Sequence, residues 1–204
     1  MEFQQVKTFL HVGCGPKHKD KTTKEFAQGD WKELRFDIDH AVEPDYIGTM
    51  TDMSALEDGF VDAIYSSHNI EHLFAHEVPE ALAEFKRVLA PDGFVVITCP
   101  DLQEVAKLIV EDKLLEPAYT SPAGPITPLD ILYGFRSSIA QGNTFMAHKS
   151  GFTEKVLRGT LSAAGFPVVA SAKRAHPFYD LWAVASAETI TEEQLRALAV
   201  AHFP

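Results

Sequence analysis

Four short apolar runs in the first half of the chain predict buried β-strands. Most of them have apolar residues at consecutive positions, and each is followed by turn or polar residues. A continuous apolar run is typical of a strand that is covered on both faces, as in a parallel sheet. The runs are KTFLHV (7–12), ELRFDID (33–39), VDAIYSS (61–67) and GFVVITCP (93–100), with a weaker candidate, DYIGTM (45–50), between the second and the third.

A helical repeat separates the last two of these strands. Val78, Leu82, Phe85 and Leu89 recur at helical spacing, and the opposite face carries charged side chains. Strand, helix and strand in this order predict parallel strands joined by right-handed crossovers.

The second half of the chain predicts helices and then a hairpin. The pattern loosens over 103–150, where Thr127 and Pro128 predict the start of a helix that stops at Gly142. Another helix is expected from Thr153. Its inward positions would be Val156, Leu157, Leu161 and Ala164. The segments PVVASAKR (167–174) and FYDLWAVASA (178–187) then predict a hairpin, and Thr191 caps a terminal helix.

These elements together predict an α/β fold. We expect a three-layer Rossmann-like sandwich with a mostly parallel, twisted sheet of about seven strands and an antiparallel C-terminal hairpin. We expect one domain over residues 1–204, with 103–150 as a helical and loop insertion that covers the substrate site.

Composition and charge narrow the classes of function. The chain has 204 residues and a net charge of −11, which disfavours non-specific nucleic-acid binding, so no nucleic-acid partner is expected. The N-terminus MEFQQVK lacks a signal-peptide pattern, and no apolar run approaches the ~20 residues that span a bilayer. We therefore expect a cytoplasmic protein without a membrane partner. Cys14 and Cys99 fall on strands separated by one other, too far apart for a disulfide, so free thiols are expected.

Two glycines directly follow the first expected strand. In an open parallel sheet, ligands bind beyond the carboxyl ends of the strands, and Gly13 and Gly15 let the backbone turn tightly beside a ligand. The third glycine of the dinucleotide fingerprint is absent, with 16–18 reading Pro-Lys-His. Asp37 ends the second strand and can accept hydrogen bonds from both ribose hydroxyls. The pattern predicts a nucleoside site, and a tight turn without a ligand remains the alternative.

Three histidines and one glutamate raise the question of a metal. His68, His72 and His76 recur at intervals of four residues with Glu71 beside them, but the order is not H-E-x-x-H and His68 falls at a strand end. We therefore expect no metal; Glu71 and His72 are instead expected to open a helix, with Glu71 favoured by the helix dipole. His68, and His148 in a lid over the site, are candidates for a substrate contact or general base, or for structural histidines.

Four segments carry a resemblance to a known family. They occur in the family's order and at its spacing, so that Leu10 to Leu102 resembles a class I S-adenosylmethionine-dependent methyltransferase of the group often labelled type 11. The segments are LHVGCGPKH (10–18), LRFDID (34–39), VDAIYSSHNIEHL (61–73) and EFKRVLAPDGFVVITCPDL (84–102), with a weaker match in MAHKSGFTEKVLRGTLSAAGF (146–166). The resemblance implies S-adenosyl-L-methionine as cofactor and methyl transfer to a small-molecule or glycan-type acceptor.

The same resemblance implies roles for individual residues. Gly13 and Gly15 would pass under the methionine moiety with Cys14 between them, while Asp37 would hold the ribose and Ile38 would lie against the adenine. The remaining cofactor positions are Met50, Thr51 and Asp52 at the adenine edge, Ser67 and His68 facing the sulfonium, and His11, which stands where the family usually has an acid.

Three functions follow as hypotheses. The first is an active methyltransferase whose acceptor, and whose O-, N- or C-directed chemistry, the sequence leaves open. The second is a non-catalytic module that binds S-adenosylmethionine or S-adenosylhomocysteine in regulation or as a scaffold. The third is a nicotinamide-dependent oxidoreductase, which the missing third glycine disfavours. The expected partner is a small-molecule substrate. The sequence leaves open whether a second copy of the chain forms a homodimer with it.

Overall fold

A seven-stranded sheet forms the centre of the structure, a computed structural model that describes residues 6–204. Its strands are β1 (Lys7–Val12), β2 (Trp31–Asp37), β3 (Tyr46–Ile47), β4 (Val61–Ser67), β5 (Leu89–Pro100), β8 (Val168–Arg174) and β9 (Asp180–Ser186). The order is β3-β2-β1-β4-β5-β9-β8. Strands β1 to β5 pair in parallel, and β9 runs antiparallel between β5 and β8. The predicted mostly parallel sheet with a C-terminal hairpin is confirmed.

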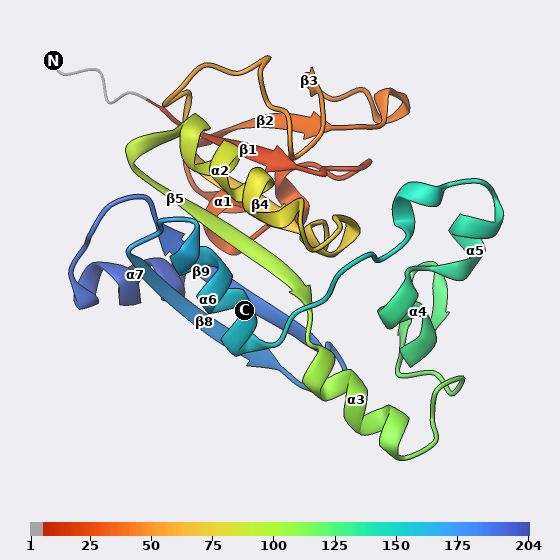
Figure 1. Ribbon diagram of the computed structural model, residues 1–204. Coiled ribbons are helices and arrows are strands. Elements are labelled where there is room, and N and C mark those ends of the chain that lie inside the picture. Colours follow the sequence, from red (N-terminus) through yellow and green to blue (C-terminus); the bar gives the residue numbers. More distant parts are fainter. Residues whose placement is uncertain (1–5) are drawn as a thin grey trace, which may run out of the picture.

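Helices lie on both faces of this sheet and complete three layers (Figure 1). They are α1 (Lys24–Gln28), α2 (Val78–Val88), α3 (Leu102–Val110), α4 (Pro128–Tyr133), α5 (Arg136–Ala140), α6 (Glu154–Ala163) and α7 (Glu192–His202). On one face, Leu82 of α2 and Leu157 of α6 share a core with Leu10 and Val12 of β1. On the other face, Phe26 of α1 joins a second core. Burial of both faces accounts for the continuous apolar runs in the strands.

Several expected elements have different bounds in the structure. The helix expected from Pro128 to Gln141 is two helices, because Gly134 adopts a left-handed φ of 94° and the Met146 carbonyl lies where its side chain would be. The strand expected from Gly93 begins four residues earlier, at Leu89. Its pairing with β4 shifts register between Val61 and Ala63, and this irregularity lets Asp92 and Gly93 lie inside the strand.

Two local expectations were wrong. Glu71 and His72 do not open an α-helix; they lie in a short 3-10 turn, Ile70–His72, and α2 begins only at Val78. Val156 does not face inward but is exposed on α6. Thr153 caps α6 and Thr191 caps α7, as predicted. The expectations for one domain over 1–204 and for the MEFQQVK terminus extend over residues 1–5, which lie outside the described residues.

The segment between α3 and α6 lies at the end of the sheet toward which β1, β2 and β5 point (Figure 1). It contains α4, α5 and a two-stranded hairpin of β6 (Tyr119–Ser121) and β7 (Gly124–Ile126). A small separate core of Val105, Ile126 and Ile131 holds it together. The insertion therefore lies at the edge where an open sheet binds its ligands.

Two smaller findings concern the cysteines and the helices. Cys14 and Cys99 are free thiols, as predicted, and both are buried. Among the helices of residues 6–204, none combines the length and the apolar character that crossing a membrane would require.

Candidate functional site

The turn after β1 is built on two glycines in the left-handed region. Gly13 has φ 61° and its N–H donates to the Phe36 carbonyl at 2.8 Å. The Asn69 side chain lies where a Cβ on Gly13 would be, and its Nδ2 donates to the Val12 carbonyl at 2.9 Å. Gly13 is therefore required by the close approach of Asn69, a residue that the sequence reasoning did not single out.

Gly15 presents an open face. It has φ 51°, and no heavy atom of the described chain lies within 4 Å of the position of a Cβ there. Its N–H donates to Oδ2 of Asp37 at 2.8 Å, and its carbonyl accepts from the buried Arg35 guanidinium at 2.6 Å. The turn is thus held on both sides of this residue while its outer surface stays free, which leaves room for the methionine part of the expected cofactor.

Asp37 lies at the end of β2, beside this turn. Oδ1 of its buried carboxylate accepts from the Asp39 N–H at 2.9 Å, and Oδ2 accepts from Gly15. A carboxylate has about four lone-pair positions, so acceptor capacity is left for ribose hydroxyls. The next residue, Ile38, is 42% exposed. On the neighbouring strand β3, Ile47 pairs in register with Asp37 and is 58% exposed. A carboxylate flanked by exposed apolar side chains suits a ribose and a flat base.

The loop expected at the adenine edge joins β3 to β4. The Thr51 hydroxyl is 3.0 Å from that of Thr49, and Met50 packs partly against the core. Asp52 is exposed, and hydrogen bonds from Ser54 lower the pKa of its carboxyl. Thr51 and Asp52 line a hollow of about 680 Å³ whose other wall is α2. Asp52 therefore stays ionised and accessible.

Two further expected cofactor residues are buried. Nδ1–H of His11 donates to Oε1 of Glu33 at 2.7 Å, and Oε2 of Glu33 accepts from the Lys19 backbone at 2.9 Å. Glu33, on the neighbouring strand, therefore supplies a carboxylate beside the position where the family has an acid. Burial raises the pKa of the Cys14 thiol to about 11, so this group is neutral.

The end of β4 brings Ser67 and His68 to the same edge of the sheet. The Ser67 hydroxyl bonds the Thr98 hydroxyl at 2.8 Å. His68 has φ 55°, a left-handed conformation that is unusual for a residue with a side chain, and its side chain is 47% exposed. Strained conformations of this kind cluster at functional sites. Its Nδ1 lies 3.4 Å from Oε1 of Glu71.

Glu71 is the most deeply buried charged group of the site. Its side chain is 1% exposed, and neither oxygen has a hydrogen-bond partner among residues 6–204. Burial by itself would raise the pKa of this carboxyl, but His68, His72 and His148 hold the pKa below its usual value. The group is therefore a carboxylate surrounded by imidazoles, which the sequence alone could not show.

His148 reaches this cluster from the insertion. Its ring centroid lies 4.9 Å from that of His72, and its backbone N–H donates to the Tyr133 carbonyl at 3.2 Å. Burial lowers the pKa of His148. His76, the third histidine of the spacing pattern, instead stacks on Phe74 at 5.8 Å. The structure thus joins His68, His72 and His148, while His76 interacts with Phe74.

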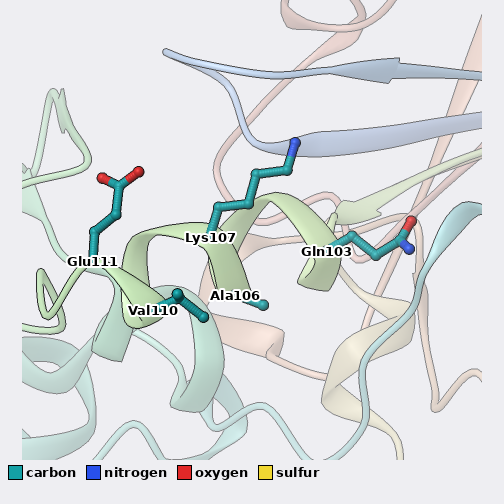
Figure 2. A pocket seen from close by; sticks show the side chains of 5 residues that line it. All are labelled: Gln103, Ala106, Lys107, Val110 and Glu111. Carbon is teal, nitrogen blue, oxygen red and sulfur yellow. The ribbon is translucent and has the colours of Figure 1, made fainter.

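Another hollow, of about 350 Å³, is lined by a single helix. Figure 2 shows its wall on α3, and Lys107 there is paired with Glu104 at 2.6 Å. The expected site residues all lie elsewhere. Its lining residues are Gln103, Ala106, Lys107, Val110 and Glu111.

Comparison with known proteins agrees with this geometry. Residues 10–97 match the family model described as "Methyltransferase domain". A comparison with curated protein sequences gave no match.

Solved structures share the fold at low identity. A protein from Pyrococcus horikoshii OT3 is 14% identical with a TM-score of 0.60, covering 92% of this chain and 84% of its own. A SAM-dependent methyltransferase from Archaeoglobus fulgidus is 15% identical with a TM-score of 0.57, covering 90% and 87%. The 1,6-didemethyltoxoflavin-N1-methyltransferase of Burkholderia thailandensis, with bound 1,6-didemethyltoxoflavin and S-adenosylhomocysteine, is 15% identical with a TM-score of 0.55, covering 88% of this chain and 70% of its own. Residues 10–97 therefore match a methyltransferase domain, and the chain shares its fold with these solved structures.

Proposed function

We propose that this chain transfers the methyl group of S-adenosylmethionine to a small-molecule or glycan-type acceptor. The observation that carries the proposal is the open face of Gly15 beside the Asp37 carboxylate, at the carboxyl ends of adjacent parallel strands. A nucleoside with an amino-acid tail needs such a carboxylate for its sugar and such a turn for its tail.

Different residues around this turn bind different parts of the cofactor. Asp37 holds the ribose, Ile38 lies against the base, and Gly15 lets the methionine part approach the backbone. The other proposed cofactor contacts are His11 and Gly13, Cys14 between the glycines, Met50, Thr51 and Asp52 at the adenine edge, and Ser67 and His68 near the sulfur. When bound, the cofactor supplies a methyl group already activated by a positively charged sulfur. The protein's contribution is to align the acceptor with that methyl and to exclude water.

His68 is the proposed acceptor contact. It follows β4, its ring is half exposed, and its strained backbone turns the chain at the end of the strand. The insertion 103–150 lies at the same end of the sheet and forms the remaining wall of the acceptor site, where it contributes His148. The Burkholderia relative in fold acts on a small molecule, which supports an acceptor of that class.

Calorimetry and a transfer assay test the proposal together. The full chain should bind one S-adenosylhomocysteine and show no heat with NAD or NADP. Incubation with methyl-labelled cofactor and fractionated small molecules from cells should label at least one fraction. His68→Ala should abolish the labelling and weaken S-adenosylhomocysteine binding to a smaller extent, because it removes one of several cofactor contacts, whereas His76→Ala, which changes an exposed histidine nearby, should leave both unchanged.

The outcomes separate the hypotheses. Tight cofactor binding with no labelled product in any fraction would favour a non-catalytic binding module. Binding of the nicotinamide cofactors, and not of S-adenosylhomocysteine, would overturn the methyltransferase proposal altogether.

We propose further that the enzyme works in the cytoplasm as a homodimer. The two buried, unpaired thiols, Cys14 and Cys99, suit a reducing compartment. Light scattering on the purified chain tests the dimer, and localisation of a tagged chain tests the compartment.

A further inference from the structure

Three side chains from two distant segments meet beside the proposed acceptor site. One donor atom each from Glu71, His72 and His148 lies within 4.8 Å of the others. From this cluster we propose that the protein holds a divalent transition-metal ion, of which Zn²⁺ is the representative, with these three residues as its ligands. The proposal does not depend on methyl transfer, and it departs from the sequence-based expectation of no metal.

The Glu71 carboxylate is the first argument for a cation. It is 1% exposed, and no hydrogen bond from residues 6–204 reaches either oxygen. An ionised carboxylate that leaves water without a partner is strongly destabilising, so buried carboxylates are paired or coordinate metals. His68 Nδ1 lies 3.4 Å from Oε1 and can pair with that oxygen when its ring is protonated, but the His68 side chain is 47% exposed and Oε2 has no hydrogen-bond partner among residues 6–204. A bound cation would give the Glu71 carboxylate the partner that it lacks.

The hydrogen bonds of the two histidines are the second argument. Nδ1 of His72 lies 3.1 Å from the Ala147 carbonyl, and Nδ1 of His148 lies 2.8 Å from the Ile131 carbonyl. A carbonyl oxygen only accepts, so Nδ1 carries the proton in both rings and Nε2 keeps its lone pair when the ring is neutral. Metal-binding histidines have this arrangement, in which the other ring nitrogen donates to a backbone carbonyl and fixes the ring.

Backbone hydrogen bonds hold the two segments together, which is the third argument. The N–H groups of Lys149 and Ser150 donate to the Glu71 carbonyl at 2.8 and 3.1 Å. The segment that contains His148 is therefore hydrogen-bonded to the backbone of Glu71, which directly precedes His72. The three ligands are held in place by the fold itself, so binding a metal would require little reorganisation.

The donor set indicates the class of metal. Two imidazoles and one carboxylate bind Zn²⁺ in several hydrolases and Fe²⁺ in many oxygenases, and in both they leave coordination positions open. His72 and His148 are partly exposed, and the exposed His68 lies at the edge of the cluster. An open position on this side would bind water or an oxygen of the acceptor.

Metal titration of the full chain tests this inference. Protein freed of metal by a chelator would be titrated with Co²⁺ by visible absorption and with Zn²⁺ by calorimetry. We expect one ion per chain and a Co²⁺ spectrum that Zn²⁺ abolishes. His148→Gln and Glu71→Gln should weaken binding by at least about a hundredfold, more than the loss of an outer partner brings. His76→Gln, at a histidine of the same segment outside the cluster, should bind as the wild type does.

Folding and cofactor binding are measured on the same samples. Circular dichroism and S-adenosylhomocysteine affinity should be unchanged in His148→Gln. If Glu71→Gln does not fold, the metal affinity of His148→Gln alone decides whether the cluster binds the ion. Absence of one-to-one binding in the wild type would overturn the inference, and so would wild-type affinity in His148→Gln, which would show adventitious binding at other histidines. Retained S-adenosylhomocysteine binding in either case leaves the proposed function standing.

Discussion

The backbone N–H of Gly15 and the carboxylate of Asp37 are joined by a 2.8 Å hydrogen bond across the ends of β1 and β2. The carbonyl of the same glycine accepts a hydrogen bond from Arg35. The two bonds together set the shape of the turn after β1. The turn is therefore fixed before any ligand arrives, and its open face lies next to the group that would hold a ribose. Fixing a binding site in advance lowers the entropy lost on binding.

The two glycines of this turn should respond differently to an added methyl group. Gly13→Ala would place its Cβ on the Asn69 side chain, so we expect the free energy of unfolding to fall by about 2–4 kcal/mol. Gly15→Ala meets no atom and should cost only about 1–2 kcal/mol for its left-handed φ, while its methyl group fills the proposed cofactor space. Urea unfolding and S-adenosylhomocysteine calorimetry measure the two effects.

The contrast between the variants carries the test. Gly15→Ala should remain folded and lose at least about tenfold in S-adenosylhomocysteine affinity, equivalent to 1.4 kcal/mol. An affinity unchanged from the wild type would show that the cofactor does not approach Gly15.

His202 should make stability depend on pH below neutrality. It lies buried at the end of α7, bonded to the Thr23 hydroxyl at 2.9 Å, and burial lowers its pKa to about 4. In the unfolded chain a histidine titrates near pH 6.5. The neutral, buried ring therefore makes its full contribution to the free energy of unfolding above pH 6.5. Up to about 3 kcal/mol of this contribution is lost as the pH falls from 6.5 toward 4.

Replacement of His202 isolates this effect from other acid-titrating groups. Urea unfolding of the wild type and His202→Gln would be compared between pH 7.5 and pH 4, a range set by the two pKa values. The stability difference between them should shrink or reverse as the pH falls. A difference that stays constant over the range would contradict the assignment.

Asp130 should stabilise the insertion and, through it, the position of His148. Despite burial, bonds from Arg136 and Thr127 hold the pKa of Asp130 well below its usual range, and Nε of Arg136 lies 2.7 Å from Oδ1. Asp130→Asn removes this charge pairing and should cost about 1–3 kcal/mol of local stability. Hydrogen exchange of the α4 amides and of residues 147–149 should then speed up.

A matched control is available on the same insertion. Asp112 is exposed and has a left-handed φ of 59°, which asparagine adopts readily, so Asp112→Asn should leave exchange unchanged. Equal exchange in wild type and Asp130→Asn would show that α4 does not depend on this ion pair.

The sheet could be predicted from the sequence because its signal is local. Runs such as 61–67 contain consecutive apolar residues, since both faces of each strand are covered, and the observed β4 has the predicted bounds. The break of the helix at Gly134 could not be predicted in this way. It depends on the close approach of the Met146 backbone, a contact that only the folded insertion creates.

The site could be predicted in part for the same reason. Gly15 and Asp37 follow strands directly, so their meeting at one edge follows from a parallel sheet. The cluster around Glu71 depends on His148, which lies 77 residues further along the chain, and on a 3-10 turn in place of the expected helix. No spacing rule within one element contains that information.

The affinity of Asp37→Asn for S-adenosylhomocysteine tests the account most directly. Asparagine keeps the size of the side chain but removes the charge, and Asp39→Asn serves as a control two residues away on the same loop. We predict one S-adenosylhomocysteine per wild-type chain, a loss of about 1–3 kcal/mol of binding free energy in Asp37→Asn, and near wild-type binding in Asp39→Asn. Equal affinity in the wild type and a folded Asp37→Asn, or no binding by the wild type, would contradict the central claim.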